Sequence, residues 1–157
     1  MSWRILAVVG LLAVSASAYA EEMSIGTITF GEETFEIVYA AAHEGPMKAV
    51  VDLEFFSEEL PAGETFFSLD SEATAVLRGM RLRISEDPAY KNGTWMHPSI
   101  DGHDKFYYFG EDDPILLTYE SSADRISGSI VGEDQVGGTS IKVALTFDLP
   151  IAADEDD

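Results

Sequence analysis

The 157-residue chain carries 29 acidic side chains against nine lysines and arginines, has a formal net charge of −20 at pH 7, and contains no cysteine. This charge repels the phosphate backbone of nucleic acids and anionic lipid surfaces, which argues against both as partners. Without cysteine there is no disulfide, thiolate nucleophile or zinc–thiolate site, so a folded domain must depend on its hydrophobic core.

The first twenty residues have the pattern of a cleaved secretory signal peptide. Arg4 provides a positive start, an apolar stretch follows, and Ala18-Tyr19-Ala20 offers the small side chains that a signal peptidase requires. The apolar stretch is shorter than the roughly 20 residues of a membrane-spanning helix. We therefore expect cleavage after Ala20, no stable membrane insertion, and a periplasmic or secreted product. An exported chain without disulfides favours a bacterial cell envelope.

Alternating apolar and polar side chains predict β-strands from residue 25 onward. The first two predicted strands flank a glycine-containing turn, which is typical of a hairpin. In the most regular strand, the apolar side chains are expected to face the core, with Lys48, Asp52 and Glu54 on the other face. One short helical turn is predicted within residues 71–78, capped by Asp70 or Ser71. The strands predicted in this half are residues 25–30, 34–40, 47–56, 65–69 and 80–85.

The second half continues the alternation, with strands predicted at residues 106–109, 115–120, 125–131 and 140–149. Short strands between turn-forming residues predict an all-β fold, an antiparallel β-sandwich (immunoglobulin-like or jelly-roll-like) of about eight or nine strands. We expect one domain over residues 21–151 and a disordered acidic tail over residues 152–157.

The segment from His97 to Gly110 contains two histidines six positions apart and suggests a metal site. Asp101-Gly102 predicts a two-residue hairpin turn, which would set His97 opposite Phe106 and point the two imidazoles to opposite faces. One imidazole and the carboxylate of Asp104 are fewer than the four ligands of a closed zinc site. His97, His103 and Asp104 are therefore only weak zinc candidates, and His43, expected in a loop, could supply a missing ligand.

Acidic loops at residues 110–114, 85–88 and 132–134 offer the oxygen ligands that calcium prefers. None of them has the alternating ligand positions of a self-contained calcium loop. Solvated turn carboxylates are the simpler interpretation, and calcium binding stays open as an alternative.

Two further features suggest binding. Arg78, Arg81 and Arg83 concentrate positive charge in an acidic chain, and on a strand the last two share a face. Planar guanidinium groups could hold a carboxylate or phosphate with two parallel hydrogen bonds, although arginines more often pair with neighbouring acids. The aromatic residues 106–109 are apolar on both faces, which predicts a central buried strand. An exposed aromatic strip that stacks on a sugar or peptide is the alternative.

Motifs of common enzymes are missing from the sequence: there is no G-x-S-x-G elbow, H-E-x-x-H helix or glycine-rich phosphate loop. We therefore predict a non-catalytic exported module, with no cofactor, that binds a partner protein or a small ligand. Two alternatives remain: a divalent-cation (calcium or zinc) binding protein that uses acidic loops, and an immunity- or inhibitor-type protein whose acidic surface meets a basic partner.

Overall fold

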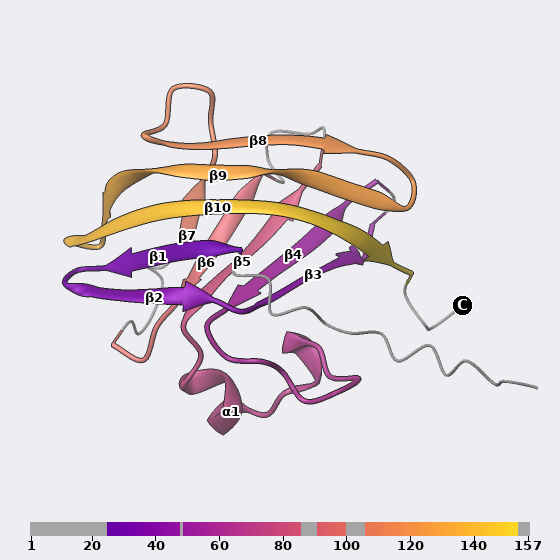
Figure 1. Ribbon diagram of the computed structural model, residues 1–157, viewed down its shortest axis with the longest axis horizontal. Coiled ribbons are helices and arrows are strands. Elements are labelled where there is room, and N and C mark those ends of the chain that lie inside the picture. The colour runs from indigo at the N-terminus through magenta and orange to yellow at the C-terminus, as the bar shows by residue number, and fades with distance from the viewer. Residues whose placement is uncertain (1–24, 48, 86–90, 100–105, 154–157) are drawn as a thin grey trace, which may run out of the picture.

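The computed structural model describes residues 25–47, 49–85, 91–99 and 106–153. Most of this part of the chain is in strands, as the alternation predicts, and ten strands form one curled sheet. Figure 1 shows two layers whose strands cross each other. The predicted signal peptide at residues 1–20 and the last residues of the acidic tail, 154–157, lie outside the described residues. No helix in the described ranges is long and apolar enough to cross a bilayer.

The first layer is antiparallel throughout, and its strands lie side by side in the order β8, β9, β10, β1, β2. The longest of them, β10, pairs with β9 over nearly its whole length and with β1 over only five residues. Their bounds are Ile115–Ser121 for β8, Arg125–Val136 for β9, Thr139–Ala152 for β10, Gly26–Phe30 for β1 and Glu33–Ile37 for β2.

The second layer is an antiparallel meander in the order β3, β4, β5, β6, β7. It joins the first layer where the far end of β10 pairs with β3 in parallel, at Ile151 and Ala152. The bounds are Tyr39–Glu44 for β3, Val51–Phe56 for β4, Gly79–Ile84 for β5, Asn92–Met96 for β6 and Phe106–Tyr108 for β7.

This junction makes the sheet mixed and curled into a half-barrel, so it is not clearly the closed antiparallel sandwich that the sequence predicts. The physical reason is the length of β10: its 14 residues extend past the five-residue β1 and leave backbone groups that β3 can pair with. The same pairing corrects the predicted start of the tail, because Ala152 belongs to β10.

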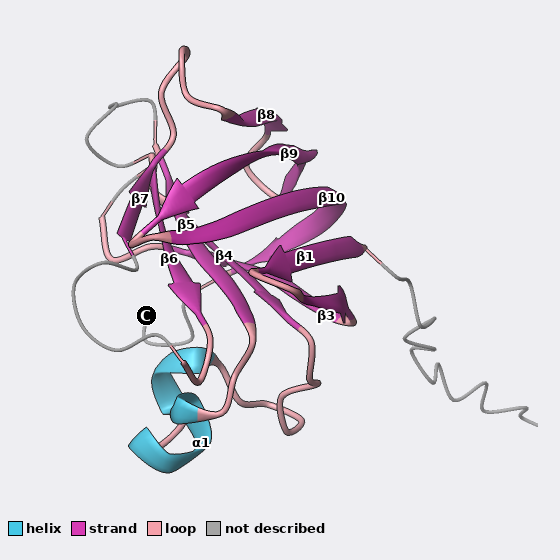
Figure 2. Ribbon diagram, turned by 90° about the vertical axis from the view of Figure 1, so that its left-hand side faces the viewer, coloured by secondary structure: helices cyan, strands magenta, loops and turns pink. Residues whose placement is uncertain are grey.

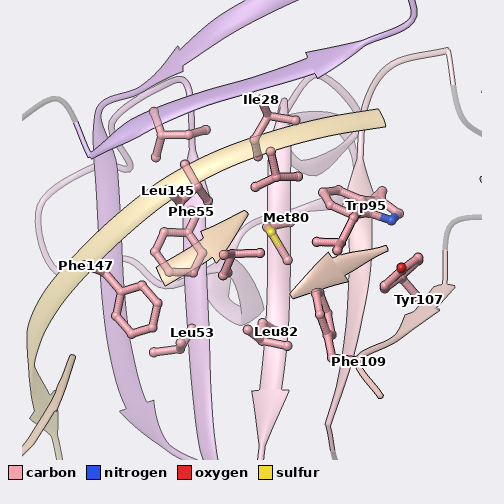
Figure 3. Close-up of a cluster of buried hydrophobic side chains, with 14 of the residues drawn as sticks. Ile28, Leu53, Phe55, Met80, Leu82, Trp95, Tyr107, Phe109, Leu145 and Phe147 are labelled. Atoms are coloured by element: carbon pink, nitrogen blue, oxygen red, sulfur yellow. The ribbon is translucent and has the colours of Figure 1, made fainter. Parts of the chain in front are cut away.

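The hydrophobic core lies between the two layers (Figure 3). Phe147 of β10 meets Phe55 of β4 with ring centroids 5.5 Å apart, and Trp95 of β6 meets Tyr107 of β7 at 6.1 Å. Each large side chain buried in this way contributes about 1.5–3 kcal/mol, more than a typical surface ion pair. Packing between the layers is therefore the main stabilising interaction in a chain without disulfides.

Several predicted elements differ from those observed. The strand predicted at residues 34–40 is divided into β2 and β3 at Val38, whose N–H donates to the carbonyl of Phe56 in the second layer instead of continuing along the first. The predicted strand at 65–69 is wrong, because Phe66–Ser68 form a 3-10 turn, η1. The short helix is confirmed as α1, Ser71–Ala75, with Asp70 accepting from the N–H of Ala73 at 2.8 Å.

The predicted hairpin register is also wrong. Thr94, and not His97, lies opposite Phe106. Residues 97–105 connect the two strands, which is more than a two-residue turn, and residues 100–105 of this connection, with His103 and Asp104, lie outside the described residues. β7 ends the described strand order, and Phe106 and Tyr108 are exposed, so the prediction of a central strand buried on both faces is wrong as well.

Candidate functional site

The outer face of the second layer, turned away from the core, carries charged side chains in two cross-strand rows. Pairing sets Asp52 of β4 opposite Arg83 of β5, and Glu54 opposite Arg81. His43 of β3 lies opposite Asp52, in a strand and not in the loop that the sequence suggested. These five residues are called the outer-face cluster: His43, Asp52, Glu54, Arg81 and Arg83.

The connection between β4 and β5, residues 57–78, folds over this cluster. Figure 2 shows α1 and its flanking loops at one end of the second layer. The backbone N–H of Phe66 in η1 lies 3.4 Å from Oε2 of Glu54, and the ring of Phe66 stacks on that of Phe56. The connection therefore turns what would be a solvent-facing position of β4 into an enclosed one. Glu54 is 0% exposed and Asp52 6% exposed.

Asp52 and Arg83 form a complete ion pair. Both carboxylate oxygens of Asp52 accept from Arg83, Oδ1 from Nε and Oδ2 from Nη2, each at 2.6 Å. Such bidentate charge-assisted hydrogen bonds are among the strongest side-chain contacts in proteins. They hold the side chains of Asp52 and Arg83 in one orientation.

Glu54 and Arg81 are paired less completely. Nε of Arg81 lies 3.9 Å from Oε1 of Glu54, and Nε2 of His43 lies 3.7 Å from Oε2, both beyond hydrogen-bonding distance. These two nitrogens and Oε1 are buried and have no hydrogen-bond partner among the residues that the structure describes. Since buried polar groups are nearly always hydrogen-bonded, three such atoms in one place mark the cluster as unusual and point to a role other than stability.

Aromatic rings hold Arg81 in position. The central carbon of its guanidinium lies 4.1 Å from the ring centroid of Phe66 and 4.1 Å from that of Phe67. Cation–π contacts of this kind orient the flat guanidinium group and leave the N–H donors in its plane for other partners. Burial lowers the pKa of Arg81, and Glu54 acts in the opposite direction. An arginine nevertheless stays protonated at neutral pH.

The carboxylate of Glu54 also affects the neighbouring titratable groups. It raises the pKa of the His43 imidazole, with a smaller contribution from Asp52, while burial and Arg81 lower it. Burial, and then Glu54, raise the pKa of the Tyr39 hydroxyl to about 12. Tyr39 therefore stays neutral in the physiological range, and His43 is the group of this face that changes charge near neutral pH.

A pH dependence follows from His43. Because folding raises its pKa above the ordinary value of 6.5, its interaction with Glu54 stabilises the fold fully below that value, and this stabilisation is lost as pH rises through the folded pKa. We expect the wild type to exceed His43→Gln in free energy of unfolding by about 1 kcal/mol at pH 5.5 and by less at pH 8.5. Urea unfolding of both proteins at the two pH values checks this. An equal difference at both values would contradict the assignment.

An open pocket of about 250 Å³ adjoins the cluster. Charged, polar and aromatic side chains of four strands and of the β4–β5 connection surround it. Phe67 is 65% and Phe106 45% exposed, so both of these lining side chains have surface that a ligand could contact. The lining residues are Asp52, Phe67, Arg81, Leu82, Arg83, Asn92, Thr94 and Phe106.

The structure separates the other predicted site residues. Arg78 lies apart from Arg81 and Arg83 and pairs with Glu33 and Glu58. His97 hydrogen-bonds Glu33 at 2.9 Å and Ser99 at 2.6 Å, and its ring stacks on Phe30. Both ring nitrogens of His97 are thus engaged with protein groups.

The metal candidates lie partly outside the described residues. Among the residues that the structure describes, no three histidine or acidic side chains are grouped so as to hold a metal ion. Residues 132–134 are part of β9 and not an acidic loop, and Asp113 of the 110–114 segment accepts from the N–H of Gly110. Residues 86–88, His103 and Asp104 are not described.

Sequence reasoning missed Glu54 and the ring pair Phe66–Phe67 as parts of a site, and it considered His43 only as a loop residue that could supply a metal ligand. The signal for Glu54 was present, because an acid opposite an arginine on adjacent strands follows once the two strands are paired. The rings had no such signal, because the sequence predicts a strand at residues 65–69 and nothing in that segment indicates a turn over Arg81. Comparisons of this chain with protein-family models, curated proteins and solved structures find no match.

Proposed function

We propose that this protein is an exported, non-catalytic binding module of the bacterial cell envelope that takes a small ligand in the pocket beside the outer-face cluster. The observation that carries the proposal is the buried pair of Glu54 and Arg81, whose facing atoms lack hydrogen bonds next to a pocket with exposed aromatic walls. Fixed, incompletely satisfied polar groups beside apolar walls are the usual composition of a ligand site.

The features of the cluster favour binding over catalysis. Asp52 is engaged through both oxygens by Arg83, and Glu54 has no solvent exposure, so neither carboxylate is placed to exchange protons with a substrate in solution. Export rests on the signal-peptide pattern of residues 1–20. The half-barrel is mostly β, and we retain the immunoglobulin-like or jelly-roll-like β-sandwich architecture as part of the proposal.

A pocket-filling variant tests the proposal. Thr94 lies between Arg81 and Phe106 in one cross-strand row, so the indole of Thr94→Trp would occupy the pocket. We expect some members of a library of small acids, sugars and peptides to raise the melting temperature of the wild type by several degrees, since saturating ligand at 100 times Kd adds about 2.7 kcal/mol. Thr94→Trp should show no such rise.

Thr118→Trp is the matched control, because Thr118 is exposed on β8 in the other layer. It should respond to each ligand as the wild type does. If no compound stabilises the wild type more than Thr94→Trp, the pocket is not a binding site and the proposal is wrong.

A further inference from the structure

The guanidinium of Arg81 is an incompletely satisfied group of the pocket. Its Nε is buried without a hydrogen-bond partner, and within the described part of the chain its only charged neighbour at ion-pair distance is Glu54, at 3.9 Å. The side chain is 20% exposed and lines the pocket, so part of it reaches the space where a ligand would lie. Planar, two-pronged acceptors are the partners that a guanidinium fork binds best.

The position of Arg81 is set before a ligand arrives. Phe66 and Phe67 contact the guanidinium at 4.1 Å each, and β5 is an interior strand between β4 and β6. A binding group that is already oriented loses little rotamer freedom on binding, which increases the affinity available from its contacts. The aromatic contacts thus make Arg81 a preorganised anion receptor.

The neighbouring carboxylates do not oppose an anion. Asp52 is neutralised by its two hydrogen bonds with Arg83, and Glu54 lies against Arg81 on one side and His43 on the other. In the described residues the cluster therefore contains two acids, two arginines and one histidine, in a chain whose net charge is −20. An anionic group meets less repulsion here than on the acidic surface around it.

The walls and size of the pocket define the rest of the ligand. Arg81 on β5 and Phe106 on β7 are two strands apart, roughly 10 Å at the usual strand spacing, and Thr94 lies between them. The volume of about 250 Å³ is below that of pockets for drug-sized molecules. This volume suits a single ring or short apolar body beside Phe67 and Phe106, which both line the pocket and are both exposed.

We propose that this pocket binds a small organic carboxylate, whose two oxygens accept from Arg81 and whose apolar body packs between Phe67 and Phe106. The inference rests on the proposed function and names the chemical class of its ligand. An inorganic oxyanion would accept hydrogen bonds from Arg81 but would leave the rings of Phe67 and Phe106 uncovered. A neutral ring compound would pack on these rings but would give the guanidinium no anionic acceptor.

Benzoate and benzamide are the probes, because they share shape and ring and differ in charge. Calorimetric titration of the folded protein should show saturable binding of benzoate, with benzamide and inorganic phosphate each weaker by about tenfold or more. Arg81→Lys keeps the charge but loses the planar guanidinium group. It should lower the affinity for benzoate by about tenfold and leave the affinity for benzamide unchanged. Phe106→Ala, in β7 at the end of the described strand order, should lower the affinity for both benzoate and benzamide.

Arg125→Lys is the matched control, because Arg125 pairs with Asp148 on the other layer, and it should bind benzoate like the wild type. The inference is overturned if benzoate does not bind, if benzamide or phosphate binds as well as benzoate, or if Arg81→Lys and Phe106→Ala both keep wild-type affinity. If the library instead yields a neutral ligand whose binding is abolished in Thr94→Trp, the carboxylate inference fails and the binding function stands. If no compound stabilises the wild type more than Thr94→Trp, both the carboxylate inference and the proposed binding function fail.

Discussion

Replacing Arg81 with leucine should destabilise the protein by about 3 kcal/mol, because it leaves the carboxylate of Glu54 buried without a cationic partner. Glu54 is 0% exposed, and among the described residues the other groups closest to its carboxylate are the N–H of Phe66 at 3.4 Å and the partly exposed His43 at 3.7 Å. Neither neighbour replaces a guanidinium. Denaturant unfolding at pH 7 measures the loss.

The double variant Glu54→Leu/Arg81→Leu separates the charge effect from the packing effect. If the unpaired carboxylate is the cause, removing it as well should recover most of the lost stability, since apolar replacements of buried ion pairs are often close to neutral. The recovered protein should also have lost its affinity for benzoate. A double variant no more stable than Arg81→Leu would show that the contact of Arg81 with Phe66 and Phe67 carries the stability instead.

Replacing Gly79 with alanine should cost at least about 2 kcal/mol, because both sterics and backbone conformation require glycine there. Gly79 opens β5 with φ of +152°, and an added Cβ would lie 1.9 Å from the carbonyl oxygen of Phe55 on β4. The two strands cannot keep their spacing around that atom. Because Arg81 follows Gly79 on β5, the variant should also weaken benzoate binding.

Gly63→Ala is the matched control for this experiment. Gly63 has a φ of +82°, yet no atom of the described residues lies within 4 Å of the position that its Cβ would take. It should therefore show only the conformational cost, about 1 kcal/mol. Thermal and urea unfolding of both variants gives the comparison, and equal losses would mean that the close approach of β4 to β5 is not what demands glycine at position 79.

Much of the second layer could be predicted from local pattern. Strand β5 alternates in burial along its length, and the sequence alone set Arg81 and Arg83 on one face with Leu82 on the other. The same period of two set Asp52 and Glu54 together on the outer face of β4. These predictions succeeded because side-chain direction in a strand depends only on backbone geometry within that strand.

Burial on that outer face could not be predicted from alternation. A strand with one charged face is expected to show it to water, yet Asp52 and Glu54 are almost fully enclosed. Their cover is the β4–β5 connection, in which the sequence predicts a strand at residues 65–69 but Phe66–Ser68 form a 3-10 turn beside Arg81. The position of a loop depends on the surface against which it packs, and the residues of that surface are distant in the sequence.

The sequence by itself determined that the chain is mostly β, that a short helical turn lies within residues 71–78, and that Arg81 and Arg83 share a face, because each of these depends on neighbours a few residues apart. Only the tertiary structure decided that β10 extends past β1 to pair with β3. It also decided that Arg78 forms an ion pair with Glu33, away from the other two arginines, and that Phe67 and Phe106 line one pocket. These contacts join residues far apart in the chain. They follow from which strands pair and in which register, a choice made by the packing of the whole core.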